Sequence, residues 1–268
     1  MHPLRTFLFS LGCLVSLFSV ASPAANQHGP QRTAPTPTAP PSRYYEMRIY
    51  YPPPGKFDAI VDRFRQYTTK LFEKHGMENI GYWVPTDTTQ QVLYYILAYP
   101  SRAARDSSWK AFVSDPEWKA VVAKTEANGK IVQRIESIFL TESDVSPVIK
   151  PKRETPTRTF ELRTYTAPPG KLPNLMTRFR NHSRKLLRRH GMENIAYWLT
   201  DEKEGTQPRL IYMLAHPGEA EGKQHWDEFR KDKRWIKVKA DSETEAGGSL
   251  TTKVESLYLK PTDYSPMQ

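Results

Sequence analysis

The sequence predicts an α+β protein built from two tandem ferredoxin-like repeats, each with the element order βαββαβ. The main observation is a nine-residue stretch, His75–Trp83, that returns as His190–Trp198 with a single substitution. At the same offset of 115, 20 of the 39 positions from Tyr45 to Trp83 are identical to those from Phe160 to Trp198. A unit of this length exceeds a solenoid repeat of roughly 20 to 50 residues and suits a small domain. We therefore interpret the chain as a duplication of a complete domain.

The first repeat has the alternation and the helical spacing that this order requires. Tyr45–Tyr51 alternates apolar and polar side chains before a proline-rich turn, which indicates a half-buried strand. Apolar residues then recur at helical spacing from Phe57 to Phe72, and Gly76 is expected to end that helix at its C′ position. The remaining elements are expected as strands 80–84, 91–99 and 133–140 and helices 103–112 and 117–127.

The second repeat is expected to follow the same order. Its predicted strands are 160–166, 195–199, 210–216 and 253–259, and its predicted helices are 172–190 and 223–240. Trp226, Phe229 and Trp235 match Trp109, Phe112 and Trp118 at an offset of 117. We therefore place the two domains at 43–147 and 158–268, joined by a charged, proline-bearing linker at 148–157.

The first 42 residues have the composition of a targeting segment and a spacer. Residues 1–25 combine a basic start, an apolar run from Phe7 to Val20 and small residues, which predicts a cleavable signal peptide. Residues 26–42 are rich in proline and are expected to form a disordered linker. We expect an exported protein, periplasmic or secreted. Cys13, the only cysteine, lies in the predicted signal, so no disulfide is expected in the mature chain.

The overall charge is basic, because Lys and Arg together exceed Asp and Glu by 10 and the pI is about 9.5. Such a balance favours weak attraction to anionic surfaces. Nucleic acid is not expected as a partner, since the chain has no recognised nucleic-acid motif and is expected to be exported. No Gly-x-Ser-x-Gly element and no His-x-x-x-His spacing is present, which argues against a nucleophilic serine and against a metal site.

A set of short motifs recurs in both repeats: Glu46, Arg48, Tyr50, Pro54, Gly55, Lys56, His75, Gly76 and Trp83, and again Glu161, Arg163, Tyr165, Pro169, Gly170, His190 and Trp198. In combination these motifs resemble those of the NIPSNAP family. The resemblance implies the dimeric α/β-barrel variant of the ferredoxin-like fold, with two sheets face to face and helices outside. The two repeats would then form one barrel within a chain, as an intramolecular pseudo-dimer. Both a monomer and a homodimer are compatible with this arrangement.

The resemblance leaves several function classes open. NIPSNAP proteins have no generally established reaction, and related α/β barrels include cofactor-independent monooxygenases, haem-handling proteins and ligand binders. We favour binding of a small, largely apolar ligand over catalysis. The alternatives are an α/β-barrel oxygenase or haem-handling enzyme, and an envelope interaction module. No cofactor is predicted, and haem enters only through the oxygenase or haem-handling alternative.

The candidate ligand cleft is built from the repeated stretch itself. Helical spacing from Leu172 places His190 on the side that faces the sheet, at the last turn of its helix, and His75 is placed in the same way. We expect a ligand cleft lined by the six residues His75, Tyr82, Trp83, His190, Tyr197 and Trp198. The alternative is structural, with each histidine hydrogen-bonded to a carbonyl near a helix C-terminus.

A second candidate set lies on the first strand of each repeat. Arg48 and Arg163 share a strand face with Glu46 and Glu161, opposite the apolar face that includes Tyr45. We expect the charged face to look toward the sheet of the other repeat, with ion pairs that fix the barrel. The alternative is that Arg48 and Arg163 bind a ligand carboxylate or phosphate inside the barrel.

The first helix of the second repeat is strongly basic and has no acidic residue. Its basic residues are expected on the solvent side, where they would dock on an anionic lipid or polyanion surface; they are Arg178, Arg180, Arg184, Lys185, Arg188 and Arg189. The alternative is a solvated helix face with no partner.

Overall fold

The computed structural model describes residues 43–203 and 205–268. The predicted signal peptide and the proline-rich segment lie outside these residues, so both, together with export, stay predictions. Within the described ranges, no helix combines the length and the apolar character needed to cross a membrane.

The first repeat has the predicted order βαββαβ. Its first helical position holds two α-helical segments joined by a π-helical turn, and its second holds two separate helices. Its elements are β1 (Tyr44–Tyr51), α1 (Phe57–Arg63), the π-helical turn η1 (Phe64–Thr68), α2 (Thr69–Lys74), β2 (Glu78–Pro85), β3 (Leu93–Tyr99), α3 (Arg102–Ser114), α4 (Pro116–Thr125) and β4 (Arg134–Glu142). Gly76 follows α2 with φ of 74°, the left-handed conformation that ends a helix at C′.

The second repeat has the same elements in the same order. They are β5 (Thr159–Thr166), α5 (Leu172–Arg178), η2 (Phe179–Ser183), α6 (Arg184–Arg189), β6 (Glu193–Thr200), β7 (Leu210–His216), α7 (Glu219–Lys231), α8 (Lys233–Glu245) and β8 (Lys253–Pro261). The single helix expected at 223–240 is in fact two helices. Asp232 separates them, because its backbone is extended and its carboxylate caps α8 by accepting from the Arg234 amide at 2.7 Å.

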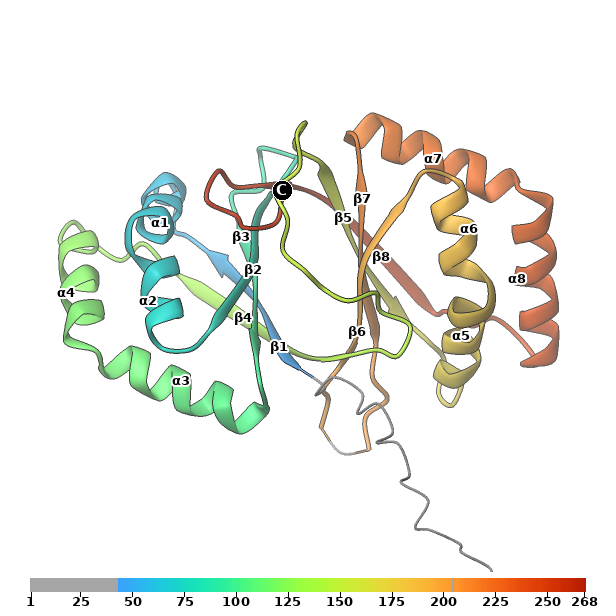
Figure 1. Cartoon of the computed structure of the whole chain (residues 1–268), viewed down its shortest axis with the longest axis horizontal. Helices are drawn as coiled ribbons and strands as arrows, with labels where there is room; N and C mark the ends of the chain where they lie inside the picture. The colour runs from blue at the N-terminus through green and yellow to red at the C-terminus, as the bar shows by residue number, and fades with distance from the viewer. Residues whose placement is uncertain (1–42, 204) are drawn as a thin grey trace, which may run out of the picture. The chain divides into compact units, whose positions relative to one another are not determined.

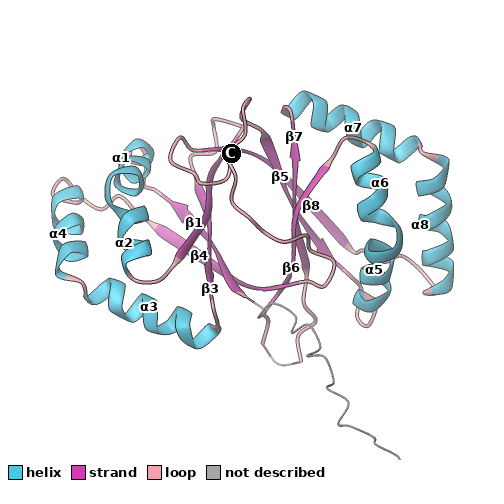
Figure 2. Ribbon diagram, viewed as in Figure 1, coloured by secondary structure: helices cyan, strands magenta, loops and turns pink. Residues whose placement is uncertain are grey.

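The eight strands close into one barrel, in the order β1-β3-β2-β8-β5-β7-β6-β4. All neighbours are antiparallel, and each repeat contributes four adjacent strands. The two seams between repeats are short, with Trp83–Pro85 of β2 on β8 and Leu140–Glu142 of β4 on β6. Figures 1 and 2 show the helices on the outside of the barrel, α1 to α4 over one sheet and α5 to α8 over the other. The predicted barrel within one chain is confirmed.

The barrel interior is apolar, which corrects the orientation expected for the first strand of each repeat. Tyr45 and Met47 point into the barrel and pack in one cluster with Trp83 and Trp198. Glu46 is instead on the outer face of β1, where the helices cover it. The physical reason is that the interior of a small closed barrel is filled by apolar side chains, whereas the helix layer supplies hydrogen-bond donors for a carboxylate.

Candidate ligand-binding site

A buried glutamate anchors a polar network between sheet and helices in each repeat. In the first repeat, Glu46 is fully buried and accepts from Arg48 at 2.8 Å, from Arg105 at 2.8 and 2.9 Å, and from Trp109 Nε1 at 2.8 Å. Burial alone would raise the pKa of Glu46, but the two guanidinium groups lower it below its usual range. The first repeat therefore holds its carboxylate with two arginines.

The second repeat holds the equivalent Glu161 differently. Its carboxylate accepts from Arg163 at 2.5 Å, Trp226 Nε1 at 2.6 Å and Ser256 Oγ at 2.6 Å, and it pairs with His216 Nε2 at 3.1 Å. Burial would raise the pKa of Glu161, but the bond from His216 and the charge of Arg163 outweigh burial and lower it to about 2. The carboxylate is therefore ionised and fully hydrogen-bonded.

The two networks differ at two equivalent positions, since Gly222 occupies the place of Arg105 and His216 that of Tyr99. A Cβ at Gly222 would lie 2.8 Å from Tyr258 and 3.1 Å from His216. The phenol and the imidazole therefore fill the space that a second arginine takes in the first repeat. His216 Nδ1 in turn faces His225 Nδ1 at 3.3 Å.

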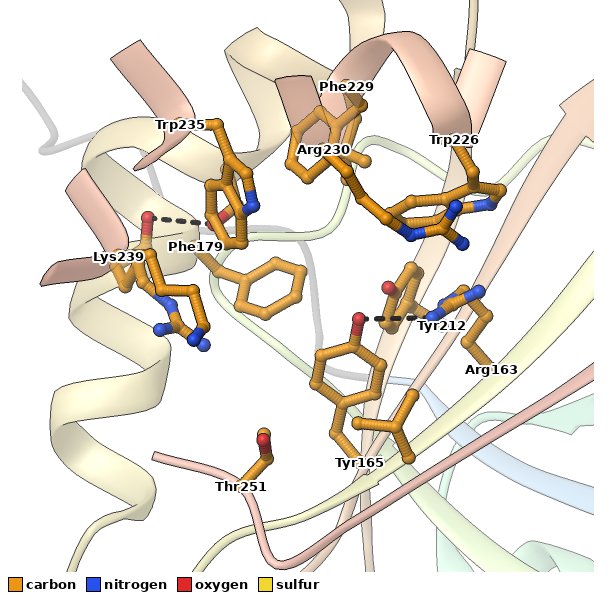
Figure 3. A pocket seen from close by; sticks show the side chains of 14 residues that line it. Arg163, Tyr165, Phe179, Tyr212, Trp226, Phe229, Arg230, Trp235, Lys239 and Thr251 are labelled. Atoms are coloured by element: carbon orange, nitrogen blue, oxygen red, sulfur yellow. Dashed lines mark hydrogen bonds between the residues drawn. The ribbon is translucent and has the colours of Figure 1, made fainter. Parts of the chain in front are cut away.

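Next to this network the second repeat contains a cavity of about 210 Å³, which we call the second-repeat pocket. It lies between the outer face of the sheet and the helices, as Figure 3 shows. Its lining is aromatic, aliphatic and basic, with no Asp or Glu: Arg163, Tyr165, Arg178, Phe179, Ser183, Leu187, Tyr212, Trp226, Phe229, Arg230, Trp235, Lys239, Thr251 and Val254. In Figure 3, Lys239 lies at one end of the pocket, and Arg163 and Trp226 lie at the other.

A single residue explains much of the room in this pocket. Leu187 lines it, and the equivalent residue of the first repeat, at the offset of 115, is Phe72. The Phe72 ring packs against Tyr95, Trp109 and Phe112, with ring centroids 5.9, 5.5 and 4.9 Å apart. The counterparts of these three rings, Tyr212, Trp226 and Phe229, line the second-repeat pocket. The first repeat thus fills with its own side chain a space that the second leaves open.

A π-helical turn supplies three of the lining residues. Arg178, Phe179 and Ser183 lie at or within η2, and the Ser183 hydroxyl donates to the Arg178 carbonyl at 3.3 Å. The first repeat has the same turn, in which Thr68 donates to the Arg63 carbonyl at 3.2 Å. Such turns inside α-helices are frequent at functional sites. The continuous helix expected at 172–190 therefore contains a wider turn at the pocket.

The family follows from the repeats. A family model described as NIPSNAP matches residues 45–147 and again residues 160–266. The chain belongs to the NIPSNAP family. No match was found among curated proteins.

Several solved structures are similar to this chain. A NIPSNAP family protein from Agrobacterium tumefaciens is 21% identical, covers 40% of this chain and 98% of its own, and has a TM-score of 0.36. A NIPSNAP domain protein from Burkholderia xenovorans is 20% identical over 39% of this chain and 98% of its own, with a TM-score of 0.35. A putative monooxygenase from Fusobacterium nucleatum is 11% identical, covers 82% of this chain and 92% of its own, and has a TM-score of 0.55. Because the identity is only 11%, the similarity to this last structure shows the fold of the whole barrel and nothing more.

The histidines of the repeated stretch, His75 and His190, lie outside the second-repeat pocket. His75 Nε2 pairs with Asp115 at 2.7 Å, and His190 Nε2 pairs with Asp232 at 2.9 Å. Each aspartate also caps the helix that follows it, α4 or α8. Each histidine therefore ties the end of one helix to the start of another.

The cleft predicted around the tyrosine–tryptophan pairs does not form. Tyr197 lies under the helices and stacks on Tyr212, with ring centroids 5.2 Å apart. Trp198 lies inside the barrel, with its ring centroid 5.9 Å from that of Tyr45. Tyr82 and Trp83 are divided in the same way. The reason is that successive side chains of a strand point to opposite faces of the sheet. Of the predicted ligand residues, only Arg163 lines the second-repeat pocket.

The basic helix is only partly a solvent face. Arg178 is 4% exposed because α8 covers it, which corrects its predicted position. Arg180 pairs with Asp144 at 2.5 Å, and Arg184 is half-buried over the Tyr197 ring. Four of the six predicted cations are exposed, namely Arg180, Lys185, Arg188 and Arg189. Docking of this helix on an anionic surface stays a prediction.

Sequence reasoning missed most of the pocket. Tyr212, Trp226 and Lys239 were not among the predicted ligand residues, although an offset of 117 aligns them with Tyr95, Trp109 and Val122. The signal was the difference between the repeats at Leu187 and Lys239 rather than their shared motifs. Among the described residues there is no group of three or more His, Cys, Asp or Glu side chains placed to hold a metal ion.

Proposed function

We propose that this NIPSNAP protein binds one small, largely apolar ligand per chain in the second-repeat pocket. The observation that carries the proposal is an aromatic-lined cavity at a place that Phe72 fills in the first repeat. Ligand sites are concave, largely apolar and lined by a few placed polar groups, which describes this lining. At about 210 Å³ the pocket is smaller than the roughly 300–1,000 Å³ that holds drug-sized ligands, so its ligand is small.

Binding ranks ahead of catalysis on the residues present. The barrel-wide likeness to a monooxygenase rests on 11% identity and concerns the fold. Haem does not fit the second-repeat pocket, because the pocket is too small for it and no histidine lines it. No lining residue is a free carboxylate or a nucleophilic cysteine.

Export is proposed on separate grounds, the signal-like pattern of residues 1–25. The test is N-terminal sequencing of the chain after expression from its full gene in a bacterial host. We expect cleavage near Ala25 and recovery outside the cytoplasm. A product that keeps Met1 would refute cleavage.

The ligand proposal is tested by mass spectrometry under native and denaturing conditions on the wild type and on Leu187→Phe. We expect the wild type to retain a small molecule that is lost on denaturation. The variant should fold equally well, since Phe72 occupies this position in the first repeat, but retain nothing. A bound mass that survives in Leu187→Phe would place the ligand elsewhere. If no mass is retained and no small aromatic acid, amide or alcohol raises the wild-type melting temperature, the proposal fails.

A further inference from the structure

We infer that the ligand is an amphipathic monoanion, with a flat apolar body among the rings of the second-repeat pocket and a carboxylate-type headgroup between Arg178 and Lys239. The inference rests on the proposed function and adds the charge and the orientation of the ligand. It follows from a count of charges at each end of the pocket and from a comparison with the first repeat.

The end of the pocket at Arg178 and Lys239 has more cations than anions. Arg178 Nη1 lies 3.5 Å from one oxygen of Glu243, and Lys239 Nζ lies 3.3 Å from the other. Both distances are longer than the 2.7–2.9 Å of a strong charge-assisted hydrogen bond. A single carboxylate is thus shared by two cations, and one positive charge at this end has no close counter-ion.

The first repeat has no such surplus. There Arg63 lies 2.8 Å from Glu126, the counterpart of Glu243, and the position of Lys239 is held by Val122. One arginine therefore meets one carboxylate at a normal distance. The added cation and the open space occur together in the second repeat, as a site for an anion with an apolar body requires.

The opposite end of the pocket offers no unpaired charge. Arg163 is committed to Glu161 at 2.5 Å and stacks on Trp226, with its guanidinium carbon 4.0 Å from the ring centroid. Arg230 pairs with Asp227 at 2.7 Å. The headgroup is therefore assigned to the Arg178 end and the apolar body to the rings between the two ends.

Buried donors without a partner lie at both ends of the pocket. Arg178 Nε, Arg163 Nε and the Tyr212 hydroxyl are buried without a hydrogen-bond partner among the described residues, and all three side chains line the pocket. Arg63 Nε and the Tyr95 hydroxyl lack partners too, so the unpaired atoms alone do not distinguish the repeats. What distinguishes the second repeat is room for a ligand to reach them. Burial lowers the pKa of Arg178, and the charge of Glu243 opposes this effect.

The test compares two probes of the same shape, 2-naphthoate and its neutral analogue 2-naphthamide, by calorimetry on the full chain. We expect one equivalent of 2-naphthoate to bind at least tenfold more tightly than 2-naphthamide. Lys239→Val should weaken the binding of 2-naphthoate about tenfold, or about 1.4 kcal/mol. The affinity for 2-naphthamide should stay unchanged. Val122 in the first repeat indicates that valine is tolerated at this position of the helix.

The matched control is Lys237→Val, which removes the same charge from the same helix. Lys237 is exposed, pairs with Asp241 at 2.8 Å and does not line the pocket, so this variant should bind 2-naphthoate like the wild type. Equal weakening by the two variants would show a diffuse charge effect and overturn the assignment.

The remaining outcomes separate this inference from the proposed function. If 2-naphthamide binds as tightly as 2-naphthoate and Leu187→Phe abolishes both, the pocket takes neutral ligands and only the charge assignment fails. If neither probe binds, the inference fails, and the proposed function is decided separately by the mass retained in the wild type and lost in Leu187→Phe. The charge assignment is supported if Lys239→Val loses 2-naphthoate binding at an unchanged melting temperature and Lys237→Val does not.

Discussion

Two glutamates at equivalent positions show how one buried carboxylate is stabilised in two ways. Glu46 is held by two arginines, whose charge does not change over any ordinary pH, whereas Glu161 is held by one arginine, a histidine and two neutral donors. A buried carboxylate is tolerated only when its hydrogen bonds are complete. At the residue scale, then, the second network depends on Glu161 staying ionised.

This dependence predicts how stability falls with acid. The folded-state pKa of Glu161 is about 2, below the roughly 4.3 of a glutamate in an unfolded chain. Because the pKa is lowered on folding, the stabilisation by this group is complete above about pH 5 and is lost as pH falls toward 2. Urea unfolding from pH 6 to 2.5 should therefore show that the wild type has a larger free energy of unfolding than Glu161→Gln at pH 6. This difference should shrink progressively below about pH 4.5. Parallel curves for the two proteins would contradict this.

At the element scale, the histidine of each repeated stretch belongs to the joint between helices. His190 follows α6 and pairs with Asp232, which separates α7 from α8. The arrangement in the first repeat is the same, with His75 and Asp115. The recurrence of this pair at both joints favours a structural role over ligand contact.

Replacement of His190 by alanine should therefore cost stability and spare the ligand. We expect a loss of about 1 kcal/mol, the net value of one hydrogen bond, measured by urea unfolding. Retention of the small molecule in native mass spectra should be unchanged. This differs from the sequence-based expectation that His190 lines the ligand cleft. His75→Ala is the control, since its joint lies in the repeat without the second-repeat pocket. A folded His190→Ala chain that no longer retains the ligand would restore the original prediction.

The strand and helix types were predictable from local pattern, and their orientation was not. All eight strands lie where alternation or apolar runs predicted them. Alternation alone could not say which face of β1 looks inward, because both faces are buried, one in the barrel and one under helices. The burial of Arg178 likewise depends on α8, which packs on it from about 60 residues further along the chain. Such contacts leave no periodic signal in the helix itself.

At the scale of the whole molecule, duplication lets one repeat diverge while the other preserves the barrel. Both repeats contribute the same four strands and the same seams, although their side chains differ under the helices at Phe72 and Leu187. The motifs shared by the repeats therefore report the fold and the family. The candidate site was hidden from motif reasoning because it lies where the repeats differ, at Leu187 and Lys239.

If these two differences create the site, transferring them should create a second one. The double variant Phe72→Leu, Val122→Lys removes the ring that fills the first repeat and places a lysine where it shares Glu126 with Arg63, as Lys239 shares Glu243 with Arg178. We expect it to bind two equivalents of 2-naphthoate per chain in calorimetry, against one for the wild type. Phe72→Leu alone should cost about 1–2 kcal/mol, because part of a packed core is emptied. A folded double variant that still binds one equivalent would contradict the claim that these two differences create the site.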